Sequence, residues 1–276
     1  GKVNLSWGSA EQAPYDGIRI KATGKTVEGE LARLTFAFGP EEWDRESFHQ
    51  AVDDLKACNW QRMTDNFLAT GANPGSVDWF DDEGWAQITE HMRIAAWIAR
   101  EGGLKGIVFD AESYSEYHQW MYTEQPGRDE HSFEEYYDKA RERGREVMGA
   151  ICEEYTEITV FTFFANIVNA TAAKRADPRT VLKGLSYGLY TPFIDGWLEV
   201  LPPTATLIDG CERAYHFNDV DDFLNAAQFI RSDAQTLVSP ENRAKYRAQV
   251  QVGFGIYLDA HANPPDAAWY LDPGEG

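Results

Sequence analysis

The sequence predicts a (β/α)₈ barrel of the TIM type in the α/β class, and three observations carry that prediction. Seven short apolar segments have the composition of strands, and segments with helical periodicity separate most of them. The segments are apolar throughout rather than alternating, as is expected of parallel strands buried on both faces. No glycine-rich nucleotide-binding motif follows the early strands, which makes a doubly wound sheet the second choice.

The candidate strands occur at irregular but short intervals. In chain order they are residues 3–7, 34–38, 66–70, 106–110, 158–164, 205–209 and 249–257. Residues 268–271 are the one candidate for an eighth strand, and their strand pattern is weak. We therefore expect a missing or irregular eighth strand. We expect a single domain over residues 1–276, which is truncated at one end if that strand is absent.

Helices are expected between these strands. Apolar residues share one face in Phe48–Leu55 and again in Trp85–Ala99. Ser132 and Glu135 have the spacing of a capping box and predict the start of a long helix. Asn218 or Asp219 is expected to cap the next helix, and the Ser239-Pro240 pair predicts the start of another.

Composition excludes several classes of function. The chain has a net charge of −20, which repels phosphate backbones, so a nucleic-acid partner is not expected. No run of apolar residues is long enough to span a membrane, and the negative charge disfavours binding to anionic membranes. The apolar fraction of 43% indicates a globular chain rather than a disordered one.

Aromatic residues are frequent, with nine Trp, thirteen Tyr and fifteen Phe. Most of these rings are expected in the core, and the rest would stack on flat apolar ligand faces such as those of sugar rings. The three cysteines Cys58, Cys152 and Cys211 form no CxxC pair and predict no disulfide framework. An acidic, Trp-rich chain is typical of secreted carbohydrate-active enzymes. We therefore expect a secreted or periplasmic protein, although no signal peptide is recognisable at residue 1.

The strongest chemical signal lies at the end of the fourth candidate strand. In a barrel, reacting groups lie at the carboxyl ends of the strands, and this strand ends in Phe109-Asp110-Ala111-Glu112. Asp110 and Glu112 are two residues apart, so on an extended chain they point to the same face. Neighbouring carboxylates repel each other, which raises one pKa as a general acid requires. The alternative is a loop cap with a surface ion pair.

The segment Gly106–Glu112 resembles the end of the DGxDxDxE motif of family 18 chitinase-like glycoside hydrolases. In that family the motif lies on the fourth strand of a (β/α)₈ barrel. The resemblance implies that Glu112 is the general acid and that Asp110 orients the N-acetyl group of the substrate. Lys105 and Val108 stand where the motif has its first two Asp residues. More broadly, the chain resembles a barrel glycoside hydrolase that carries its acid/base residue on strand four.

A second carboxylate is expected from a later strand. Asp209 and Glu212 follow the sixth candidate strand, and Asp259 follows the seventh. Carboxylates about 5 Å apart predict a retaining mechanism, and carboxylates about 6.5–9.5 Å apart predict an inverting one. The sequence does not choose between these geometries. Each of the three is equally consistent with a plain loop cap or ion-pair partner.

Several polar and aromatic residues near the proposed strand ends are candidates for binding substrate. Asn166 could bond a sugar hydroxyl, and long loops at a barrel top are often functional. Packing of these side chains on the barrel is the alternative in each case. The substrate-binding candidates are Asn166, Tyr187, Tyr190, Tyr257, Tyr114 and Trp7.

No metal or cofactor is expected. The six His residues form neither HxH nor HExxH, and the sequence contains no GxSxG elbow. The sequence therefore predicts a glycoside hydrolase acting on a neutral or amino-sugar polysaccharide, in which Asp110, Glu112, Asp209, Glu212 and Asp259 supply the carboxylates. Two alternatives stay open: a catalytically silent barrel that binds glycans or a protein partner, and a sugar enzyme with a carboxylate-bound metal. Its oligomeric state is not predicted.

Overall fold

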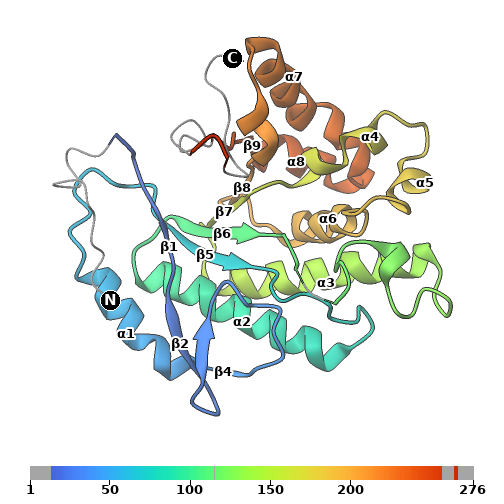
Figure 1. Ribbon diagram of the computed structural model, residues 1–276. Helices are drawn as coiled ribbons and strands as arrows, with labels where there is room; N and C mark the ends of the chain where they lie inside the picture. The colour runs from blue at the N-terminus through green and yellow to red at the C-terminus, as the bar shows by residue number, and fades with distance from the viewer. Residues whose placement is uncertain (1–13, 115, 257–263, 267–276) are drawn as a thin grey trace.

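The computed structural model describes residues 14–114, 116–256 and 264–266. Its centre is a six-stranded sheet in which every neighbouring pair is parallel and the strands follow chain order (Figure 1). The strands are β1 (Arg19–Ile20), β5 (Phe67–Gly71), β6 (Gly106–Asp110), β7 (Thr159–Thr162), β8 (Thr206–Asp209) and β9 (Val250–Val252). This architecture confirms the α/β class.

Helices follow most of these strands, and one face of the sheet packs against them. The α-helices are α1 (His49–Lys56), α2 (Asp82–Glu101), α3 (Phe133–Glu154), α4 (Ala170–Ala173), α5 (Pro178–Leu182), α6 (Tyr190–Val200), α7 (Val220–Arg231) and α8 (Arg243–Gln249). The 3-10 helices are η1 (Arg45–Phe48), η2 (Tyr122–Glu124), η3 (Asn166–Asn169), η4 (Glu212–His216), η5 (Asp233–Leu237) and η6 (Pro240–Asn242). The predicted caps at Ser132 and Asp219 are confirmed for α3 and α7.

A small antiparallel sheet, absent from the sequence prediction, precedes α1. It has the order β3 (Leu31–Arg33), β2 (Thr23–Thr26) and β4 (Trp43–Asp44). The ring of Phe48 lies against Gly24 of this sheet and is fully buried. The predicted strand at residues 34–38 is wrong: these residues form turns and one isolated bridge, Phe36 with Ala72, because the chain reverses there to reach the end of β5.

The two faces of the large sheet differ in what covers them. Phe109 of β6 packs its ring 5.4 Å from Trp197 of α6, so this side of the strand faces the helices. Asp110, the next residue, points to the opposite face. On that face, the rings of Phe67 and Phe161 meet at 6.0 Å across β6, where Gly106 has no side chain. Strands two apart are separated by roughly 10 Å in a flat sheet. The contact is therefore favoured by curvature that makes this face concave.

The sheet is not a closed barrel in the part of the chain that the structure describes. Among these residues β1 and β9 are the edge strands, and no pairing joins them. The predicted strand at residues 3–7 and the weak candidate at 268–271 lie outside the described residues. None of the described helices has the length and apolar character needed to cross a bilayer.

The segment that begins at Tyr190 forms α6, which packs closely against α3. A Cβ atom added to Gly144 of α3 would lie 2.0 Å from the carbonyl oxygen of Phe193, and one added to Gly196 would lie 2.0 Å from that of Arg141. Glycine is thus required by the close approach of the two helices, although in the sequence it looks like a helix breaker.

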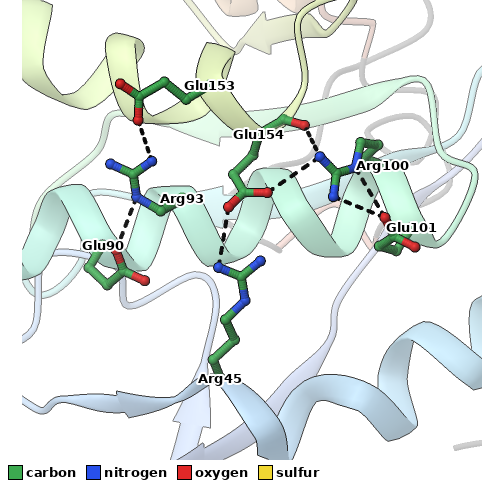
Figure 2. A network of polar contacts seen from close by, with 7 residues as sticks. All are labelled: Arg45, Glu90, Arg93, Arg100, Glu101, Glu153 and Glu154. Atoms are coloured by element: carbon green, nitrogen blue, oxygen red, sulfur yellow. Dashed lines mark hydrogen bonds and ion pairs between the residues drawn. The ribbon is translucent and has the colours of Figure 1, made fainter.

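An ion-pair network joins α2 to the end of α3 at the surface (Figure 2). Glu154 is its least exposed member and accepts from both Arg45, at 3.2 Å, and Arg100. Arg93 of α2 pairs with Glu90 and with Glu153 of α3. Exposed pairs of this kind contribute about 0–1 kcal/mol each, so the network orients the helices more than it stabilises them.

Candidate active site

The carboxylates of Asp110, Glu112 and Glu212 gather at the carboxyl ends of β6 and β8. Asp110 is the last residue of β6, and its Oδ1 accepts the backbone N–H of Glu112 at 3.1 Å. Glu212 begins η4 just after β8, and its backbone N–H donates to the carbonyl of Phe163 at 2.9 Å. Asp110 and Glu112 lie close enough to Glu212 for their negative charges to raise its pKa. The structure therefore brings together three of the five carboxylates that the sequence predicted.

Two of these carboxyl groups, Glu212 and Asp110, have raised pKa values. Burial raises the pKa of Glu212 to about 7, and the negative charges of Glu112 and Asp110 add to the rise. Burial also raises the pKa of Asp110, with the charge of Glu112 acting in the same direction, while the N–H of Glu112 and the cation of Arg19 oppose it. A carboxyl group that keeps its proton near pH 7 beside other carboxylates is suited to general acid catalysis.

Arg19 of β1 is a site residue that the sequence analysis missed. Its Nη2 lies 3.8 Å from Oδ2 of Asp110, and its guanidinium lies 4.9 Å from the ring centroid of Phe163. The side chain is 33% exposed. The alternation Ile18-Arg19-Ile20, with one cation between two apolar residues, is the sequence signal that could have found it.

Removing the cation of Arg19 should make Asp110 harder to ionise. In Arg19→Met we expect the pKa of Asp110 to rise, because the favourable charge beside the carboxylate is lost while burial is unchanged. Carboxyl ¹³C NMR titration measures this directly, and Arg19→Lys should restore most of the difference. Arg62→Met, which removes an exposed arginine paired with Asp16, is the control. An Asp110 titration that does not respond to Arg19→Met would contradict the assignment.

Three tyrosines surround the carboxylates. Tyr187 is half-buried, and its pKa is raised by burial and by the charges of Glu112, Asp110 and Glu212. Tyr114 is 74% exposed, and its pKa is raised by partial burial of its hydroxyl and by its hydrogen bond to Glu112. The third tyrosine is Tyr215 of η4, which was not predicted from the sequence. Its pKa is raised by burial and by the charges of Glu212 and Glu112. Tyr114 and Tyr187, two of the predicted substrate-binding residues, therefore lie near the carboxylates.

The structure places Asp209 away from this cluster, which corrects its predicted role. It is fully buried, and its two oxygens accept the backbone N–H groups of Ala165, at 2.9 Å, and Ile167, at 3.0 Å. Its charge helps to raise the pKa of Tyr190 of α6 and of Tyr246 of α8, so Asp209 lies between the sheet and the helices. Burial raises the pKa of Asp209 to about 6 against the effect of these N–H donors. Asp209 caps the loop after β7.

Two predicted substrate-binding residues are also part of the core. Tyr190 is fully buried, with its ring 4.7 Å from that of Trp120. Asn166 is 1% exposed, and its Oδ1 accepts from Thr191 at 3.1 Å. Neither side chain is positioned to reach a ligand at the carboxylates. Trp7, Tyr257 and Asp259 lie outside the described residues.

A pocket of about 350 Å³ adjoins Glu212 on the concave side of the sheet. Its described walls come from the ends of β7 and β8 and from the chain that follows β9. They are formed by Phe161, Phe163, Gly210, Glu212, Tyr215, Gly255 and Ile256. Among the described residues, no three His, Cys, Asp or Glu side chains are grouped so that they could hold a metal ion.

Comparison with known proteins adds no relative. The chain matches no protein family, no curated protein and no solved structure.

Proposed function

We propose that this protein is a glycoside hydrolase and that Glu212 donates the proton to the leaving oxygen. The observation that carries the proposal is a carboxyl group with a pKa of about 7 that lines a pocket and lies beside two further carboxylates at the strand ends of a parallel sheet. The resemblance noted in the sequence assigned the acid to Glu112. The raised pKa of Glu212 favours this residue as the acid, and Glu112 then becomes the second reacting carboxylate.

The reaction assigns each group a task. Glu212 transfers its proton to the glycosidic oxygen as the bond between that oxygen and the anomeric carbon breaks. Glu112 acts at the anomeric carbon, either directly as nucleophile or by activating water, and water supplies the new hydroxyl group and the proton that restores Glu212. Asp110 fixes the backbone at Glu112 through its hydrogen bond. Tyr114 donates to Glu112 and presents an exposed ring to the sugar.

We propose further that the six parallel strands belong to a (β/α)₈-type barrel. The support is the strictly sequential strand order, the concave face with contacts across it, and the position of the carboxylates at the carboxyl ends of the strands. In such a barrel the concave face would be the interior.

Hydrolysis of a broad panel of oligosaccharides, polysaccharides and synthetic glycosides by the wild type and by Glu112→Gln tests the proposal. We expect cleavage by the wild type and a loss of roughly 10²-fold or more in the variant, because the amide cannot act as nucleophile or base. Glu116→Gln, an exposed carboxylate four residues further along, is the matched control and should keep full activity. A folded wild type that binds glycans but cleaves none would favour a binding barrel instead.

A further inference from the structure

The pocket beside Glu212 has preformed aromatic walls. The ring of Phe161 is held edge-on against Phe67 at 6.0 Å, and one face of Phe163 is covered by the guanidinium of Arg19. Its volume of about 350 Å³ falls within the range of ligand-binding cavities. These walls therefore form a shaped cavity before any ligand enters.

Two glycines of the cavity wall allow close backbone approach. A Cβ atom added to Gly210 would lie 2.3 Å from the carbonyl oxygen of Thr162 and 2.6 Å from the ring of Phe161. A Cβ atom added to Gly255 would lie 2.9 Å from the Cα of Glu212. No side chain fits at either position unless a neighbour shifts, because the backbone there lies close to Phe161 and to Glu212.

The polar groups near Glu212 are not among the described walls of the pocket. Asp110 and Glu112 affect the pKa of Glu212, and Glu212 affects that of Tyr187, whereas the described walls include two Phe rings and Ile256. Among the described pocket residues, only Glu212 and Tyr215 have polar side chains. Burying a hydroxyl without a hydrogen-bond partner is unfavourable, so these walls suit a sugar ring poorly.

We propose that this pocket binds the leaving group of the substrate and that the leaving group is apolar, an aryl or branched alkyl alcohol rather than a second sugar. The inference rests on the proposed hydrolase function, because Glu212 must stand between the sugar that is cleaved and the group that departs. It makes the preferred substrate a small glycoside with a hydrophobic aglycone. The alcohol leaves with the proton that Glu212 supplies.

Binding of p-cresol alone to the whole protein, followed by NMR titration, tests the pocket without requiring turnover. We expect saturable binding to the wild type and at least about tenfold weaker binding to Ile256→Asp, which places a charge at the pocket wall where Ile256 is 65% exposed. Leu224→Asp is the matched control, because Leu224 is 60% exposed on α7 and is not a wall residue. It should bind p-cresol as the wild type does.

Steady-state kinetics with p-tolyl and methyl glycosides of the same sugar completes the test. We expect a lower KM for the p-tolyl glycoside, and we expect Ile256→Asp to remove that difference. Failure of p-cresol to bind, or equal binding to Ile256→Asp, would overturn the inference even if glycosides are cleaved. Binding of p-cresol by a protein that cleaves no glycoside would instead refute the proposed function and, with it, the assignment of the occupant as a leaving group.

Discussion

Replacing Glu212 by Gln should lower kcat on an alkyl glycoside by roughly 10²–10⁴-fold, the usual contribution of a positioned general acid. In the wild type, the pKa of Glu212 is about 7, so the protonated form is present below that pH and is lost as the pH rises through it. Activity should therefore fall above about pH 7. The variant cannot titrate at this position, and its residual activity should lack that decline.

The choice of leaving group separates a proton donor from a merely structural residue. A 2,4-dinitrophenyl glycoside needs little protonation of its leaving oxygen, so Glu212→Gln should lose far less activity on it than on the alkyl glycoside. Equal losses on both substrates, or persistence of the decline above pH 7 in the variant, would show that Glu212 is not the acid.

At alkaline pH, Glu212→Gln should raise the free energy of unfolding although it lowers activity. The folded-state pKa of Glu212, about 7, lies above its ordinary value of 4.5, so ionisation favours the unfolded chain. Its contribution to stability is complete below the ordinary value and is lost as the pH rises towards 7. Glu212→Gln should therefore be more stable than the wild type at pH 8, and the difference should disappear at pH 4. Urea unfolding at the two pH values measures this.

Trp120→Ala should cost about 3–5 kcal/mol in the free energy of unfolding, as large-to-small substitutions of buried aromatic residues do. Trp120 is fully buried among Phe38, Tyr190 and Phe193. Its indole Nε1 also donates to the carbonyl oxygen of Ala111 at 2.6 Å, and Ala111 lies between Asp110 and Glu112 in the chain. The residue thus links the core to the position of the site.

Trp120→Phe isolates that second role. The ring still fills most of the space, but the hydrogen bond to Ala111 is lost, at a cost of about 1 kcal/mol in stability. We expect kcat to fall by about tenfold, because Asp110 and Glu112 are no longer held by the segment between them. Denaturant unfolding and steady-state kinetics on the same samples give the two quantities.

Trp85→Phe is the matched control for this substitution. Trp85 is also fully buried and donates its indole N–H to a backbone carbonyl, that of Asp78, at 3.0 Å. It has no bond to the segment that carries the site, so it should lose similar stability and keep kcat. Equal kinetic losses in the two variants would mean that core packing, and not the bond to Ala111, sets the activity.

Local patterns in the sequence were sufficient to predict most strands of the parallel sheet. The apolar run 106–110 predicts β6 with its observed bounds, and the segments around β5, β7 and β8 are confirmed within a few residues. β5 and most of β6 are buried on both faces, so the apolar composition of these strands distinguishes them. Spacing also placed Asp110 and Glu112 together at a strand end, because the residues are two apart in the chain and alternation directs both to the same face.

Tertiary structure decided the rest, since the deciding contacts join residues far apart in the chain. Gly196 looks like a helix breaker and is required by the close contact of α6 with α3. Asp209 and Glu212 are three residues apart and equivalent in the sequence, yet one caps a loop on the helix side and the other lines the pocket. Arg19 becomes a site residue only because the sheet curves enough to bring β1 towards the ends of β6 and β7. Burial and charge, which depend on that curvature, distinguish Glu212 as the proposed proton donor.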